Sequence, residues 1–186
     1  VSTDSTPSPL TPQGDLVKAA DLTARVLTAE LFDGLDAILA IAADVDCRPA
    51  LLKGCSTALL YYPEPHLRTM GDIDLFVTKN ERPAFEAALR VGGFTEAAGA
   101  ASQNYYRDHH HSVPLWHPDL HVRLEIHSAL YSPRSPLIAD PKFSTKSIET
   151  QLTAISFRGH TVRVLTHEAQ LVYTSTRWAE YPTPER

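Results

Sequence analysis

Two aspartates, Asp72 and Asp74, stand two residues apart at the start of an apolar run that continues to Val77. Because side chains alternate along a β-strand, both carboxylates would lie on one face, with their Cα atoms about 7 Å apart. Two carboxylates at this spacing can converge on one divalent cation or on a pair of metal ions. Without a cation they repel each other, and one of them takes up a proton. A solvated pair at an exposed strand end is the alternative, since Asp-x-Asp is short and common.

A second run of alternating residues extends from His121 to His127. Its ionisable side chains are expected on one face of a strand and its apolar side chains on the other. The ionisable set is His121, Arg123, Glu125 and His127. Glu125 could therefore meet the aspartate pair across a sheet as a third carboxylate. Oxygen ligands of this kind, together with substrate phosphates, suit Mg²⁺ and phosphate chemistry better than zinc hydrolysis.

A Lys53-Gly54 pair ends a predicted strand just before a predicted helix, a position that could bind an anion. Glycine lets the backbone approach a ligand closely, and the amides that open a helix attract anions. Lys53 or Arg68 could add charge-assisted hydrogen bonds to phosphate oxygens. Ser56 is a further candidate for a phosphate contact through its hydroxyl group.

Three consecutive histidines, His109, His110 and His111, suggest a metal site. On a strand only His109 and His111 would share a face, because the middle ring points away. Surface or cleft-lining roles are therefore favoured over ligation. A metal hydrolase that uses His109, His111, His121 and His127 is kept as an alternative.

The elements that would position these residues alternate between helical and strand patterns. The expected helices cover 15–43, 56–62, 81–91 and 167–178, and the expected strands cover 49–54, 72–78, 109–116, 120–129, 152–157 and 161–165. We predict a break in the first helical pattern at Asp33-Gly34, and N-caps at Asn80 and Thr166. The polar segment 132–147 is predicted to be a loop. The order predicts an α+β fold in which helices pack on one face of a small mixed sheet.

The bulk composition fits one globular domain, with 186 residues of which 43% are hydrophobic and 21% are charged. The net charge of −5 comes without the clustered Lys and Arg that a long duplex requires, so no such partner is expected. No apolar run reaches the ~18 residues of a membrane helix. Cys47 and Cys55 make neither a disulfide scaffold nor a zinc site, which favours the cytoplasm.

Three parts of the chain are expected to differ in organisation. Residues 1–14 are rich in Ser, Thr and Pro and are predicted to be a disordered lead-in. Residues 15–186 are predicted to form a single domain. This domain would hold N-terminal helices over 15–44, the sheet that carries the site over 45–165, and the start of a C-terminal helical part over 166–186.

Taken in order, three motifs resemble one family. They are Leu-Lys53-Gly54-Cys-Ser-Thr-Ala-Leu, then Arg68-x-x-x-Asp72-Ile-Asp74-Leu, then Leu-Glu125-Ile-His127. This pattern is similar to the nucleotidyltransferases of the DNA polymerase beta superfamily, in particular to the fifth family, a bacterial group of uncharacterised nucleotidyltransferases. The resemblance spans roughly residues 45 to 130. It also extends to the toxin nucleotidyltransferases of abortive-infection systems.

The resemblance implies a small mixed sheet flanked by helices and a Mg²⁺-dependent enzyme, in which Mn²⁺ could substitute. It implies that Asp72, Asp74 and Glu125 hold the metal, while Lys53-Gly54 receives the triphosphate of ATP or another nucleoside triphosphate. It also places His111 near the site, and His127 could line the site or simply end its strand. Nucleoside monophosphate would pass to the hydroxyl of an unknown acceptor with release of pyrophosphate. A non-catalytic module that binds nucleotide or a protein partner is the main alternative.

Overall fold

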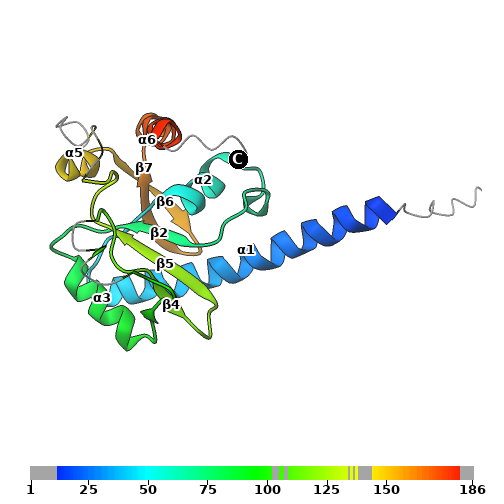
Figure 1. Ribbon diagram of the computed structural model, residues 1–186, viewed down its shortest axis with the longest axis horizontal. Coiled ribbons are helices and arrows are strands. Elements are labelled where there is room, and N and C mark those ends of the chain that lie inside the picture. Colours follow the sequence, from blue (N-terminus) through cyan, green and yellow to red (C-terminus); the bar gives the residue numbers. More distant parts are fainter. Residues whose placement is uncertain are drawn as a thin grey trace, which may run out of the picture.

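The computed structural model describes residues 12–101, 105–106, 109–133, 135, 137 and 144–180 (Figure 1). Its helices are α1 (Pro12–Asp44), α2 (Lys53–Tyr61), the 3-10 helix η1 (Pro65–Leu67), α3 (Arg82–Val91), α5 (Thr145–Glu149) and α6 (His167–Glu180). Its strands are β1 (Ala50–Leu51), β2 (Ile73–Phe76), β3 (Thr95–Glu96), β4 (Leu115–His117), β5 (Val122–His127), β6 (Leu152–Phe157) and β7 (His160–Leu165). Within the described ranges, no helix combines the length and apolar character that a bilayer crossing requires.

The strands among the described residues form one mixed sheet in the order β3-β4-β5-β2-β1-β7-β6. Two neighbouring pairs are parallel, β2 with β5 and β1 with β7, and the other pairs are antiparallel. Helices flank this sheet, so the predicted α+β fold class is confirmed. The parallel pairing of β2 with β5 brings together the two strands that carry the predicted carboxylates.

Strand alternation divides the sheet into two faces with separate apolar cores. The α1 face packs against α1 and α3 through side chains such as Leu35, Phe85 and Leu75. The α6 face packs against α5 and α6 through side chains such as Phe76 and Tyr173. Figure 1 shows α1 and α3 on one side of the central strands and α5 and α6 on the other. The prediction that helices pack on one face only was therefore wrong.

Helix α1 is continuous, so the predicted break at Asp33-Gly34 was also wrong. A Cβ atom built on Gly34 would lie 2.9 Å from Cβ of Val122, which is closer than real carbon atoms approach. Gly34 therefore lets the helix pack directly on β5. The helix begins at Pro12, inside the predicted lead-in, and residues 1–11 of that lead-in lie outside the described residues.

Several predicted boundaries around the central strands shift. Helix α3 begins one residue late, with Glu81 rather than Asn80 at its N-cap. Strand β5 begins at Val122 because His121 has a φ of 50° in the left-handed region, so its side chain leaves the alternating face. The predicted strand 109–116 is a bend that leads into β4, and α5 occupies part of the predicted loop 132–147.

The C-terminal elements follow the sequence pattern closely. Strands β6 and β7 form the predicted hairpin, whose turn residues Arg158 and Gly159 have φ values of 47° and 87°. Two positive φ values are typical of the tight turn that matches the twist of a hairpin. Thr166 caps α6 as predicted, because its Oγ1 accepts a hydrogen bond from the Ala169 amide at 3.4 Å.

Candidate functional site

The parallel register of β2 and β5 places the predicted site residues opposite one another. Asp74 pairs with Glu125, and Phe76 pairs with His127. Because paired residues share a face, Asp74 and Glu125 both point to the α6 face of the sheet. Side chains at alternate positions, such as Ile73 and Leu124, fill the core on the α1 face.

Four side chains converge at this point. Lys53 Nζ donates to Asp74 Oδ1 at 2.5 Å and lies 3.8 Å from Glu125 Oε2. His127 Nε2 lies 2.7 Å from the same Asp74 oxygen and 3.9 Å from Glu125 Oε2. Ligand atoms of Asp74, Glu125 and His127 all lie within 4.8 Å of one another, so these three residues could hold a metal ion. We call these three residues and Lys53 the carboxylate cluster.

Lys53 has an uncommon backbone conformation. It opens α2 with a φ of 47°, in the left-handed region that side-chain-bearing residues rarely adopt. Such a conformation costs on the order of 1–3 kcal/mol and persists only where its surroundings fix it. Here the Leu52 amide bonds to the Asp74 carbonyl at 2.9 Å, which ties the start of α2 to β2.

Burial controls the electrostatics of the cluster. Asp74 is 2% exposed and His127 is fully buried. Burial raises the pKa of the Asp74 carboxyl, and the charge and hydrogen bond of Lys53 offset part of that rise. Burial also lowers the pKa of His127 well below its usual range, with the charges of Lys53 and His111 acting in the same direction. His127 is therefore neutral, and its Nε2–H donates to Asp74.

Asp72 lies beside the cluster without joining its hydrogen bonds. It is half-buried in the bend just before β2, rather than within the strand as predicted. Burial raises the pKa of its carboxyl, and the charges of Asp74 and Glu125 raise it further. Like-charge repulsion from these two carboxylates thus reaches Asp72.

At the predicted phosphate turn the chain enters α2, and the side chains of this segment point in different directions. A Cβ atom on Gly54 would lie 3.1 Å from Cγ of Met70, so the missing side chain makes room for this methionine. Ser56 is buried and donates to the Lys53 carbonyl at 3.2 Å, while Gln170 of α6 lies 3.5 Å away. The hydroxyl of Ser56 thus faces α6 rather than the carboxylates.

Arg68 lies outside the ion pairs of the cluster. Its Nη1 donates to the Thr69 carbonyl at 2.5 Å. Among the described residues, no ion pair within 4 Å joins Arg68 to Asp72 or Asp74. Its guanidinium is half-buried and remains close enough to Cys55 to lower the pKa of that thiol slightly.

His111 approaches the cluster from a separate segment. It forms an isolated antiparallel bridge with His127, and the centroids of the two imidazole rings are 5.3 Å apart. Its charge lowers the pKa of Asp74. His111 therefore lies next to His127, and its role at the site stays a prediction.

Sequence reasoning missed two residues at the site. The charge of Arg177, on α6, reaches Asp74 and His127 and lowers the pKa of both. His110 packs its ring 5.3 Å from that of His127. No spacing signal points to Arg177, because its place depends on how α6 docks. His110 was set aside because a strand would turn it away, whereas the chain bends there.

Cys55 is a small buried residue rather than a reactive one. It is 1% exposed, and burial raises the pKa of its thiol to about 12, with the charges of Asp74 and Asp72 adding to the rise. The thiol therefore stays protonated although it lies at a helix start.

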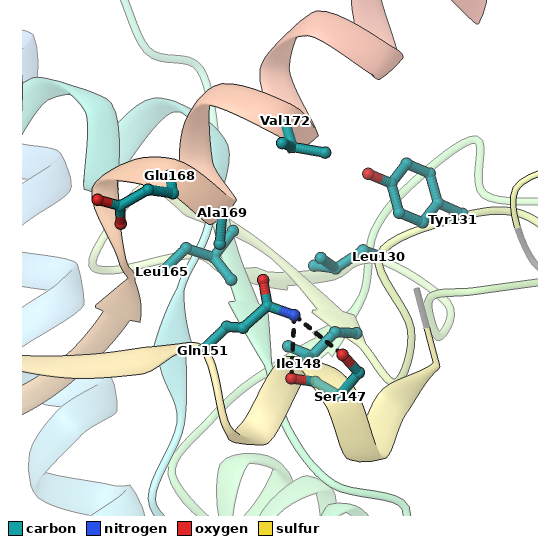
Figure 2. Close-up of a pocket in the computed structure, with 9 residues that line it drawn as sticks. All are labelled: Leu130, Tyr131, Ser147, Ile148, Gln151, Leu165, Glu168, Ala169 and Val172. Atoms are coloured by element: carbon teal, nitrogen blue, oxygen red, sulfur yellow. Dashed lines mark hydrogen bonds between the residues drawn. The ribbon is translucent and has the colours of Figure 1, made fainter. Parts of the chain in front are cut away.

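A cavity of about 300 Å³ opens on the same face of the sheet, between α5 and α6 (Figure 2). Its walls are Leu130, Tyr131, Ser147, Ile148, Gln151, Leu165, Glu168, Ala169 and Val172. Most of these side chains are apolar, and Gln151 Nε2 bonds to Ser147 inside the pocket. The cavity lies apart from the carboxylate cluster, since the two share no residue.

The sequence as a whole matches the profile of a family described as uncharacterised nucleotidyltransferases, over residues 8–180. No curated protein sequence matches the chain.

Solved structures show the same fold. The crystal structure of ANT(2")-Ia in complex with adenylyl-2"-tobramycin is similar with a TM-score of 0.56 and 16% identity, over 83% of this chain and 80% of that chain. The solution structure of the antibiotic-resistance factor ANT(2")-Ia is similar with a TM-score of 0.54 and 16% identity, over 86% of this chain and 77% of that chain. A protein of Thermotoga maritima named as a nucleotidyltransferase is similar with a TM-score of 0.55 and 13% identity, over 81% of this chain and 86% of that chain. At these identities the likeness is one of fold.

Proposed function

The chain belongs to the uncharacterised nucleotidyltransferases, as its motifs indicated, and from that premise we propose its reaction. It transfers a nucleoside monophosphate from a nucleoside triphosphate, such as ATP, to an acceptor hydroxyl and releases pyrophosphate. The reaction depends on Mg²⁺, which Mn²⁺ can replace. The observation that carries this proposal is the convergence of Asp74, Glu125, His127 and Lys53 on one face of the sheet.

The residues of the cluster fit a divalent cation. Carboxylate oxygens are the preferred protein ligands of Mg²⁺, and Asp74 and Glu125 supply them, with Asp72 adjacent. The Lys53 ammonium now lies between Asp74 and Glu125 and acts as a stand-in cation. Bound there, Mg²⁺ would neutralise charge on the attacking and leaving oxygens.

The start of α2 suits the triphosphate. Helix N-terminal amides attract anions, and α2 has no side-chain cap among the described residues to occupy them. Lys53 is placed to exchange its bond to Asp74 for bonds to phosphate oxygens once a metal ion neutralises the carboxylates. Two arginines add positive charge nearby: the charge of Arg68 acts on Cys55 in α2, and the charge of Arg177 acts on Asp74. The backbone at Gly54 remains a candidate phosphate contact, whereas the predicted contact through Ser56 is disfavoured because its hydroxyl is buried and faces α6.

The proposed chemistry is an in-line displacement. The acceptor oxygen forms a bond to the α-phosphorus, and the bond between that phosphorus and the bridging oxygen breaks, so that pyrophosphate leaves. Glu125 or one of the aspartates accepts the hydroxyl proton. His127 holds Asp74 in place through its hydrogen bond of 2.7 Å. Positioning and charge neutralisation supply most of the rate in such transfers.

We place this activity in the bacterial cytoplasm, where nucleoside triphosphates and Mg²⁺ are supplied together. The two cysteines fit that setting, since Cys47 and Cys55 are both free thiols and both buried. A small molecule or a protein that carries a hydroxyl group can serve as the acceptor. A long duplex is not among the proposed partners, because the net charge of the chain is −5.

Binding calorimetry tests the nucleotide site. ATP, GTP, CTP and UTP are titrated with and without Mg²⁺ into the wild-type chain, into Asp74→Asn, and into Asp119→Asn as a matched control at an exposed aspartate. We expect Mg²⁺-dependent binding that Asp74→Asn abolishes and Asp119→Asn leaves unchanged. Binding that is indifferent to Mg²⁺ and to Asp74→Asn would overturn the proposed metal site.

A second measurement separates an enzyme from a binding module. Pyrophosphate release is followed with the nucleotide that binds best and with tobramycin as the first acceptor, because ANT(2")-Ia was crystallised with its adenylyl derivative. Release above the rate of Asp74→Asn supports transfer. Tight nucleotide binding without release across a panel of hydroxyl acceptors would favour a non-catalytic module.

A further inference from the structure

Next to the carboxylate cluster, the three consecutive histidines form a group of their own, which we call the histidine triad (His109, His110 and His111). The sequence suggested that the middle ring would point away, but the chain bends at His109 and His110 instead of continuing as a strand. Ring nitrogens of all three histidines lie within 4.8 Å of one another. From this convergence we propose that the triad is a binding site for a transition-metal ion of the Zn²⁺ type, separate from the Mg²⁺ site.

The backbone of the triad is fixed to the sheet. The Ser128 amide donates to the His110 carbonyl at 2.8 Å, and the Ser112 amide donates to the Ile126 carbonyl at 2.8 Å. These bonds lie on either side of the bridge between His111 and His127 at the end of β5. The triad is thus held against a strand of the central sheet, which limits the ordering cost of binding an ion.

Two rings of the triad, His110 and His111, each have a nitrogen placed to bind a metal ion. His111 Nδ1 lies 2.9 Å from the Ser112 carbonyl, which can only accept, so Nδ1 carries a proton and Nε2 is the nitrogen left to bind a metal ion. This arrangement, with one ring N–H bonded to a carbonyl, is the usual way that proteins orient a metal-bound histidine. His110 Nδ1 is buried and has no hydrogen-bond partner among the described residues. A buried nitrogen of this kind is costly unless something binds it.

The third ring is oriented by stacking. The centroid of the His109 ring lies 4.2 Å from that of Tyr105, with an interplanar angle of 32°. Centroids within the triad are 4.9 Å apart for His110 and His111, and 5.6 Å apart for His109 and His111. Zn–N bonds of about 2.0–2.1 Å require nitrogen atoms about 3.4 Å apart, so small ring rotations complete the site.

The donor set separates this ion from the one in the carboxylate cluster. Neutral imidazoles suit Zn²⁺, Cu²⁺ and Ni²⁺, whereas Mg²⁺ requires oxygen ligands. Three protein ligands leave a fourth position open, as in catalytic rather than structural zinc sites. His127 lies between the two sites, because its ring centroid is 5.3 Å from that of His110 and its Nε2 bonds to Asp74.

Metal binding on its own tests the triad, because the readout does not depend on nucleotide transfer. Chelator-treated protein is titrated with Zn²⁺ by calorimetry, and bound metal is counted after dialysis. The variants are His110→Ala and His111→Ala, with His121→Ala as a matched control at an exposed histidine. We expect one equivalent of Zn²⁺ in the wild type and in the control, and an affinity at least about tenfold weaker in each triad variant.

Three further measurements fix the location of the ion without relying on the alanine variants. An Asp74→Asn, Glu125→Gln double variant should keep its Zn²⁺, and Co²⁺ bound to the wild-type chain should show the visible absorption of a four-coordinate site with three nitrogen ligands. Zn²⁺ should also protect the wild-type histidines from diethyl pyrocarbonate. Loss of Zn²⁺ in the double variant, unchanged affinity in both triad variants, or no binding to the wild type would each overturn the proposal.

Discussion

The two aspartates of the Asp-x-Asp motif have the same side chain and different surroundings. Asp74 is buried, and both Lys53 and His127 hold it through one carboxylate oxygen. Asp72 is only half-buried and mainly meets the negative charges of Asp74 and Glu125. Asp74 therefore helps to hold the site together through its hydrogen bonds. Asp72 is instead destabilised by like-charge repulsion, which a bound cation would reduce.

This difference predicts that Asp72→Asn stabilises the chain when divalent cations are absent. The folded-state pKa of Asp72 is raised above its ordinary value of 3.8, so the folded chain binds more protons than the unfolded chain above that pH. Stability is consequently lost as the pH rises from 3.8 through the raised pKa. Urea unfolding with a chelator should show the variant more stable than the wild type at pH 7, with the difference vanishing below pH 3.8.

Mg²⁺ provides the control for this prediction. Added at pH 7, it should stabilise the wild type by binding the folded state and should stabilise Asp72→Asn less. An Asp72→Asn variant that is less stable than the wild type with the chelator present would show that Asp72 has a favourable partner, contrary to the electrostatics described above.

At the level of elements, the sequence predicts what depends on local periodicity. Strand alternation correctly put Glu125 and His127 on one face, and the Thr166 cap and the β6–β7 hairpin are local patterns as well. What could not be predicted depends on contacts between distant segments. Arg177 reaches the site only because α6 packs there. Gly34 looks like a helix break in the sequence, and only the contact with Val122 shows why a glycine is needed inside the helix.

The contact of Gly34 with Val122 can be tested by adding one methyl group. In an exposed helix Gly→Ala stabilises by about 1 kcal/mol. Here the new Cβ would lie 2.9 Å from Cβ of Val122, so α1 must move away from β5. We expect Gly34→Ala to lower the free energy of unfolding by about 1–3 kcal/mol, measured in urea.

Gly71 is the matched control, since a Cβ there would have open space within 4 Å and its φ is not positive. Gly71→Ala should leave the free energy of unfolding within about 0.5 kcal/mol of the wild type. A stabilising Gly34→Ala substitution would mean that the glycine is a tolerated helix defect and that α1 does not need its close approach to the sheet.

Across the whole molecule, one face of the sheet carries the larger apolar core and the other face carries the candidate site. The α1 face is a continuous apolar core that joins α1, α3 and the central strands. The α6 face holds the carboxylate cluster, the histidine triad beside it, and the smaller core under α5 and α6. Leu75 and Asp74 are neighbours on β2, yet they point into these two different environments.

Substitutions at adjacent positions of β2 should therefore differ in effect, one lowering the free energy of unfolding and the other removing nucleotide binding. Leu75 is fully buried, and Leu75→Ala should lower the free energy of unfolding by about 2–5 kcal/mol through the lost contacts and the cavity left behind. The protein that remains folded should bind nucleotide with unchanged affinity, since the carboxylate cluster is intact. Asp74→Asn should leave most of the fold in place while it removes Mg²⁺-dependent binding. Calorimetry and urea unfolding on the same preparations measure both effects, and a Leu75→Ala variant that folds fully but loses nucleotide affinity would show that the two faces are coupled.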